Sequence, residues 1–287
     1  GEKVLHLEDY SAGFTGDGSS NDPAVDIMAE EYAPWGGLRF KEPCLKVSFS
    51  DGTRDLVLSY KNHEIAGSFL TVILADRYYP LEVLLRYRVF EDLDIIERWT
   101  EIVNGGRDVV TIEHAASAEY HFAGSGWHQT NIHGRWAAEQ VRYREALSYG
   151  KKILESRKGS TGHNHGPFFI VDRDADEDCG DVYFGALAYS GNFKVTFEVS
   201  QYDMTRVVIG INDFDFSWRL GGGEIFRTPS VFCGHTIGGF TRMSQTLHRP
   251  ALDHLLPARH RKSIRPVLYN SWEATYFDVT CEGQKAL

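Results

Sequence analysis

The sequence predicts an all-β fold, a large antiparallel β-supersandwich, followed by a short helical linker and the truncated start of a (β/α)8 barrel. Three observations lead to this prediction. One segment alternates apolar and polar residues, turn residues separate short strands along most of the chain, and helical spacing appears in only one long segment. We expect the sandwich over residues 1–238, the linker over 239–262 and the barrel start over 263–287.

The strands follow from alternation with a period of two. Apolar residues occupy every second position over 81–89, so one face of that strand is apolar. A second strand over 94–103 ends at Asn104-Gly105-Gly106, a turn sequence typical of hairpins, and the β pattern resumes at 109–112. Another hairpin is expected from the strands at 195–199 and 206–211.

Helical spacing appears after the last of these strands. Phe240, Met243 and Leu247 lie three or four residues apart, which places them on one face of a helix. Pro250 is expected to interrupt this helix before the apolar pattern continues to Leu256. The segment therefore predicts one or two helices that link the sandwich to the start of the barrel.

The last residues resemble the opening of another domain. After a basic linker at 259–262, we expect a strand over 264–270, and Thr280 offers its hydroxyl as the N-cap of a helix beginning near Cys281. A strand and half a helix cannot bury a core, and isolated helices shorter than about 12–15 residues are marginal in water. We therefore expect the chain to be the front part of a longer protein.

Composition narrows the classes of partner. The 287 residues include 40 acidic and 30 basic side chains, a net charge of −10, which argues against nucleic acid or an anionic membrane as partner. The four cysteines lie far apart and have no metal-type spacing, so we expect free thiols. No apolar run approaches the ~18 residues of a membrane span, and the first residues carry no secretory signal. We expect a cytoplasmic protein.

Several spaced motifs, in a fixed order, identify a family. They are 90–98 (FEDLDIIER), 133–136 (HGRW), 157–165 (RKGSTGHNH), 190–193 (SGNF), 213–218 (DFDFSW) and 269–278 (YNSWEATYFD). Together they resemble the N-terminal β-domain and first barrel strand of the family 36 glycoside hydrolases, the α-galactosidase family. The resemblance implies a galactose-mutarotase-like supersandwich and, for the whole protein, a retaining enzyme that removes terminal α-galactosyl residues without a cofactor or metal.

The best candidate for binding substrate is Trp272. It follows the expected barrel strand, and function in such barrels sits at the C-terminal ends of the strands. An indole face stacks on the C–H patch of a galactose ring, and the resemblance implies that Trp272 walls the sugar pocket. The alternative is a core tryptophan that packs at the domain joint.

A second candidate region is the loop 32–43, bounded by glycine and proline. The resemblance implies that this loop reaches the sugar pocket of a neighbouring subunit, which makes a homo-oligomer the expected assembly. Many family members carry an aspartate where this chain has Arg39. Trp35 and Arg39 are the expected rim residues; the alternative is an ordered surface loop.

Two further patterns point to chemistry but favour a structural role. His163 and His165 would share one face of a strand, without a third metal ligand nearby in sequence, so we expect both imidazoles to bond to backbone. Asp213 and Asp215 resemble a catalytic carboxylate pair, yet the aromatic residues around them indicate a core-facing hairpin with the aspartates at its turn.

No catalytic residue is expected in this chain. The family's catalytic aspartates lie in motifs resembling Lys-Trp-Asp and Asp-Asp-Gly-Trp, and neither occurs in this sequence. The chain alone should therefore be inactive, and α-galactoside oligosaccharides would be substrates of the parent enzyme. Two other functions stay open: a free-standing carbohydrate-binding module and a mutarotase-like epimerase, which would use a His/Glu pair.

Overall fold

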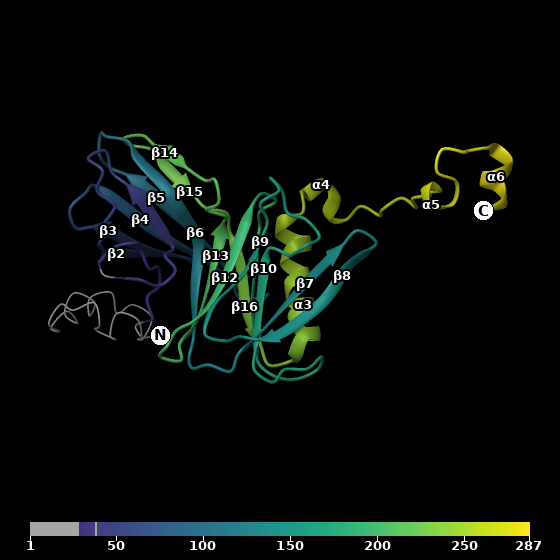
Figure 1. Ribbon diagram of the computed structural model, residues 1–287, viewed down its shortest axis with the longest axis horizontal. Coiled ribbons are helices and arrows are strands. Elements are labelled where there is room, and N and C mark those ends of the chain that lie inside the picture. The colour runs from purple at the N-terminus through teal and green to yellow at the C-terminus, as the bar shows by residue number, and fades with distance from the viewer. Residues whose placement is uncertain (1–28, 38) are drawn as a thin grey trace. The chain divides into compact units, whose positions relative to one another are not determined.

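Two antiparallel β-sheets stack face to face in the computed structural model, which describes residues 29–37 and 39–287 (Figure 1). Residues 1–28 of the predicted sandwich lie outside the described residues. In spatial order, the smaller sheet consists of β1 (Leu45–Ser48), β6 (Val110–Phe122), β13 (Thr205–Ile211), β12 (Phe193–Val199) and β9 (Gly150–Glu155), with β14 (Trp218–Leu220) also paired to β6. The larger sheet consists of β2 (Leu58–Ala66), β3 (Phe69–Asp76), β4 (Leu81–Phe90), β5 (Ile95–Asn104), β16 (Val231–Thr236), β11 (Val182–Leu187), β10 (Phe168–Asp172), β7 (His128–Arg135) and β8 (Ala138–Ala146), with β15 (Ile225–Arg227) also paired to β5. The predicted antiparallel sandwich is confirmed.

The two strands after residue 80 and the later pair at 193–211 form hairpins as expected. β4 and β5 pair along their whole length, and β12 pairs with β13 from Phe193↔Ile211 to Val199↔Thr205. The hairpin predicted at Asn104 is wrong, because β5 belongs to the larger sheet and β6 to the smaller one. The second edge of β5 is occupied by β15 and β16, and the Asn104 amide donates instead to the carbonyls of Asp108 (2.7 Å) and Leu220 (3.0 Å). The turn therefore carries the chain from one sheet to the other.

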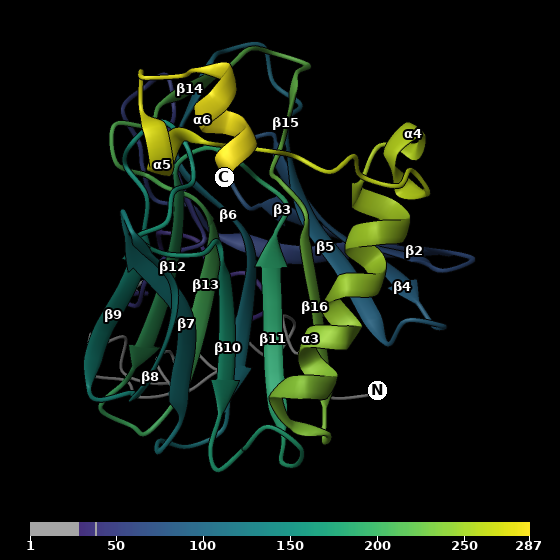
Figure 2. The ribbon, with the colours of Figure 1, turned by 90° about the vertical axis from the view of Figure 1, so that its right-hand side faces the viewer.

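The core fills the space between the sheets, and a helix covers part of the outer face of the larger sheet. On β10, Phe169 and Val171 face the smaller sheet, while Ile170 faces α3 (Gly239–Pro250). This is the alternation of a strand buried on both faces. Phe240 and Met243 of α3 complete that outer cluster, and Figure 2 shows α3 alongside β16. The predicted linker helix thus packs on the sandwich itself.

The residues after α3 form a separate unit, 251–287. It contains η1 (Ala251–Leu255), α4 (Ala258–Arg261), α5 (Trp272–Thr275) and α6 (Cys281–Ala286). Pro250 has no N–H to donate, and the helix continues past it as the wider turn of η1. As predicted, Thr280 caps α6, its hydroxyl accepting a hydrogen bond from the Gly283 N–H at 3.1 Å. No helix among the described residues is long and apolar enough to cross a membrane.

The strand expected over 264–270 is not formed. This segment pairs with no described strand, and Val267 and Leu268 are fully or almost fully exposed. A strand needs a neighbour to satisfy its backbone N–H and C=O groups, and no such neighbour lies within the described residues.

A buried ionic cluster joins the segment before β1 to the smaller sheet. Glu119 of β6 is 1% exposed and accepts hydrogen bonds from the Ala33 N–H (2.8 Å), the Cys44 thiol (2.9 Å) and His121 Nε2 (2.8 Å). Its carboxylate also pairs with Arg206 Nε on β13 at 3.0 Å. Burial alone would raise the pKa of Glu119, but Arg206 and His121 hold it well below its usual range. The cluster is therefore charged on both sides.

Another polar side chain of β6 is buried without compensation. His114 is 2% exposed, and neither ring nitrogen hydrogen-bonds a described residue. Burial, reinforced by the positive charge of Lys194, lowers the pKa of His114 from 6.5 to about 4, although Asp213 and Glu42 act in the opposite direction. His114 is therefore neutral in the folded protein at pH 7.

We predict that replacing Glu119 by Gln lowers the free energy of unfolding by about 3–5 kcal/mol, because the Arg206 guanidinium is left buried without its counter-charge. Glu113 lies on the same strand and pairs with Arg54 at the surface, so Glu113→Gln should cost less than about 1 kcal/mol. Urea unfolding of both variants measures the difference. Equal losses would contradict this role of Glu119.

We also predict that His114 makes the protein less stable in mild acid. Between pH 6.5 and about 4 the unfolded chain binds a proton on this residue that the folded chain does not. Stability contributed by the neutral form is therefore lost as pH falls through that window, by about 3 kcal/mol in total. Unfolding free energies of the wild type and His114→Phe, measured from pH 7.5 to 4.5, should diverge as the pH falls. Parallel curves would refute the prediction.

Candidate functional site

The loop that carries Trp35 is held by backbone bonds on both sides. The Trp35 N–H donates to the Leu45 carbonyl (2.8 Å), and its own carbonyl accepts from the Leu56 N–H (3.1 Å). Gly36 follows with φ 143°, and a Cβ there would lie 2.4 Å from the Leu56 nitrogen. Only glycine allows this approach of the two chain segments. The loop is thus firmly placed, with the Trp35 side chain 38% exposed.

Arg39 lies inside the loop. It is 2% exposed, its Nε is 2.5 Å from Glu30 Oε1, and its Nη1 donates to the Gly36 carbonyl at 3.3 Å. Lys41 pairs with the other oxygen of Glu30 at 2.8 Å. In the described residues Arg39 therefore orders the loop from within instead of lining an exposed rim, which corrects the expected placement. A sugar-binding role for Trp35 and Arg39 stays a prediction.

Trp272 lies at the start of α5, in the separate C-terminal unit. Its indole is 44% exposed and makes edge contacts with Tyr276 (5.6 Å between ring centroids) and Phe277 (4.9 Å). Its backbone N–H donates to the Asn270 side chain at 3.0 Å. The structure thus places Trp35 and Arg39 on one loop of the sandwich and Trp272 in the other unit, with part of the indole open to a ligand.

The aspartates of the 213–218 motif do not form a catalytic pair. Asp213 is bound to Lys194 Nζ at 2.6 Å, and Asp215 is exposed in a left-handed turn with φ 55°. The structural interpretation is therefore favoured. The aromatic residues differ from expectation: Phe216 packs on the core, whereas Phe214 and Trp218 are each about half exposed.

The two histidines of the 157–165 motif lie in the loop between β9 and β10, so they do not share the face of a strand. His165 Nδ1 makes no hydrogen bond to a described residue, so the expected bond to backbone is missing at that atom. Within the described residues, no three metal-ligating side chains come together.

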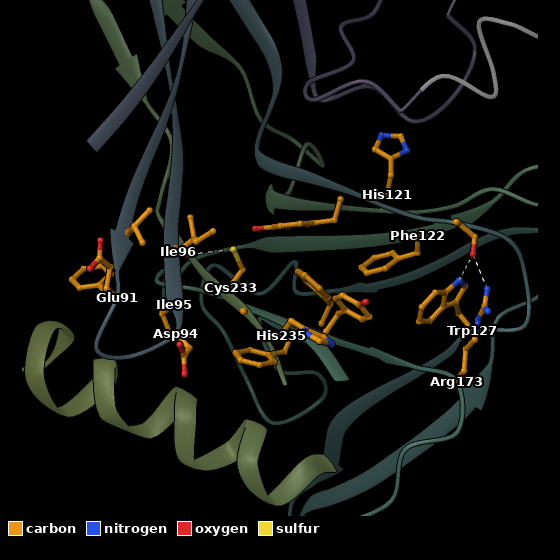
Figure 3. A pocket seen from close by; sticks show the side chains of 18 residues that line it. Glu91, Asp94, Ile95, Ile96, His121, Phe122, Trp127, Arg173, Cys233 and His235 are labelled. Atoms are coloured by element: carbon orange, nitrogen blue, oxygen red, sulfur yellow. Dashed lines mark hydrogen bonds between the residues drawn. The ribbon is translucent and has the colours of Figure 1, made fainter. Parts of the chain in front are cut away.

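Sequence reasoning missed an inter-sheet cleft of about 930 Å³ at one end of the sandwich (Figure 3). The β4–β5 turn, the end of β6, the segment before β7, and residues of β10, β11 and β16 line it. Val89 and Ile96 pair across β4 and β5 on the face that points toward the smaller sheet. They are about 40% exposed, although Leu85 and Ile102 farther along the same rows are buried. The sheets therefore separate at this end.

One wall of the inter-sheet cleft is aromatic. The Tyr183 ring stacks on the His235 imidazole, with centroids 4.4 Å apart and planes at 30°. Trp127 and Phe122 meet Tyr183 edge-on at 5.8 and 5.4 Å. His235 Nε2 is bound to Asp181 at 2.7 Å, which fixes the imidazole against Tyr183. Edge-to-face contacts of this kind hold the rings in defined orientations.

Charged groups lie at the two ends of the inter-sheet cleft. In Figure 3, Glu91 and Asp94 lie at one end, and Trp127 and Arg173 at the other. The Arg173 guanidinium stacks over the Trp127 indole at 4.4 Å and donates to the Ala123 carbonyl at 2.7 Å. Glu91 and Asp94 are exposed and bond no other described side chain. Their carboxylates are therefore free to accept hydrogen bonds from a ligand.

Comparison with known proteins gives a consistent match along the chain. Residues 3–221 match the glycosyl hydrolase family 36 N-terminal domain, and residues 225–287 match melibiase. The sequence is 33% identical over 282 residues to α-galactosidase AgaA of Geobacillus stearothermophilus, covering 91% of this chain and 39% of that protein. The chain spans about two fifths of the length of the curated relatives it matches.

Solved structures match equally well. The crystal structure of AgaA from Geobacillus stearothermophilus has a TM-score of 0.85 at 31% identity, covering 97% of this chain and 42% of that one. A variant of that enzyme in complex with stachyose has a TM-score of 0.83 at 33% identity, covering 88% and 38%.

Proposed function

The chain belongs to family 36 of the glycosyl hydrolases, and from this we propose that the protein it is part of removes terminal α-galactosyl residues from oligosaccharides. The observation that carries the proposal is the order of the two matches: the family's β-domain over 3–221 is followed directly by the start of melibiase at 225. This chain would supply the non-catalytic sandwich and the entry to the catalytic domain. The stachyose complex of the related enzyme supports α-galactosides as the substrate class.

Hydrolysis with retention needs two carboxyl groups about 5–5.5 Å apart, one as nucleophile and one as acid and base, and no cofactor. The chain's own residues would act by positioning. Trp272 would stack its half-exposed indole on the galactose ring, and the loop of Trp35 would border the pocket. Asp213 is unsuited to nucleophilic attack because Lys194 neutralises it at 2.6 Å.

We also propose a homo-oligomer in the cytoplasm. The exposed Trp35 and Phe40 on the loop 32–43 offer apolar surface for a second copy. All four cysteines are free, as in a reducing compartment. Sedimentation velocity at two protein concentrations tests the assembly, and cell fractionation tests the location.

We predict that the full-length protein hydrolyses 4-nitrophenyl α-D-galactoside, whereas residues 1–287 alone do not, because the catalytic carboxylates are absent from this chain. Initial rates of nitrophenol release from the two proteins test this. Turnover by the chain alone, lost in Asp213→Asn or Asp215→Asn, would overturn the assignment of a non-catalytic domain. A full-length protein active only on the β-anomer would overturn the proposed substrate class.

We predict that Trp272→Ala in the full-length protein lowers kcat/KM for melibiose at least about tenfold, because the stacking surface for galactose is lost. The melting temperature should stay unchanged, since the indole is half exposed. Trp136→Ala, at an 81% exposed tryptophan of the β7–β8 turn, is the matched control and should change neither quantity. A stability loss of about 3–5 kcal/mol in Trp272→Ala would instead indicate core packing.

A further inference from the structure

The inter-sheet cleft has the size and the composition of a ligand site. Its volume of about 930 Å³ lies within the ~300–1,000 Å³ of small-molecule pockets, which are mostly apolar with a few polar groups. Val89 and Ile96 are exposed on a sheet face that is otherwise buried. A sandwich that closed at this end would bury them, so the opening has to be maintained at the expense of apolar burial.

The walls specify the chemistry of the ligand. The stacked Tyr183 and His235 rings form a flat platform, which suits a ligand with a flat patch of C–H groups. At one end the carboxylates of Glu91 and Asp94 accept hydrogen bonds, and at the other Arg173 retains N–H groups beyond the one bound to Ala123. The ligand must therefore donate at one end, accept at the other and stack in between.

A neutral sugar meets all three conditions, because its hydroxyls donate and accept and its ring has an apolar face. A phosphorylated or carboxylated ligand would meet repulsion from Glu91 and Asp94. A purely apolar ligand would desolvate those carboxylates without bonding them, which is costly. We propose that the inter-sheet cleft binds a neutral mono- or oligosaccharide at a site separate from the catalytic centre. This site does not depend on the proposed hydrolysis.

Calorimetric titration of the full-length protein tests the proposal. The catalytic pocket is first saturated with 1-deoxygalactonojirimycin, and melibiose and maltose are then titrated as probes. We expect one further binding event per chain. The double variant Glu91→Gln/Asp94→Asn should weaken it at least about tenfold, because amides replace the accepting carboxylates while shape is kept. Asn at position 94 tolerates its left-handed backbone of φ 54°.

Asp92→Asn is the matched control: it lies on the same exposed turn outside the cleft lining and should bind as the wild type does. Hydrolysis of the aryl α-galactoside should be equal in all three proteins. No further binding of either sugar up to about 50 mM would overturn the proposal, because weaker binding falls below any specific affinity. Binding that the double variant leaves unchanged, or binding of glycyl-leucine in place of the sugars, would overturn it as well. Absence of hydrolysis would contradict the enzymatic function and leave the binding result standing.

Discussion

The buried carboxylate of Glu119 is the constraint on which the arrangement of the sandwich rests. A charge 1% exposed is tolerated only while every partner stays in place, and its partners come from three separate parts of the chain. Ala33 belongs to the loop of Trp35, His121 to the end of β6 and Arg206 to β13. The hydrogen bond from His121 to the Glu30 carbonyl adds a second tie to the same loop.

Both surfaces considered for ligand binding on the sandwich depend on this one cluster. The loop of Trp35 is attached to the sheet through Ala33, and His121 also lines the inter-sheet cleft. Arg39 extends the same principle outward, because Glu30 is shared between Arg39 and Lys41. Charges placed in the interior thus fix a segment that has no regular secondary structure of its own.

The sequence predicted what local patterns encode. The alternation over 81–89 and the turn between β12 and β13 are properties of neighbouring residues, and both elements formed as expected. The turn at Asn104 shows the limit, because its residues suit a hairpin while the competing partners β15 and β16 lie more than a hundred residues away. Pairing at 264–270 failed for the same reason: a strand depends on a neighbour that its own residues do not specify.

The candidate site was predictable only in part. The aromatic residue and its loop were visible around Trp35, but the burial of Arg39 follows from Glu30, whose ion pair no spacing rule indicates. The inter-sheet cleft was invisible because Ile96, Tyr183 and His235 come from three different strands and belong to no shared motif. Their juxtaposition is a consequence of sheet order.

The order of strands in the smaller sheet also bears on how the protein is made. β6 lies between β1 and β13, so its two neighbours come from residues 45–48 and 205–211. Synthesis at about 5–20 residues per second separates the emergence of β6 from that of β13 by several seconds. Throughout that interval one edge of β6 has no neighbouring strand, and Glu119 has no Arg206. The nascent chain therefore presents an unpaired edge as it emerges, which makes it a client for chaperones until residue 211 has left the ribosome.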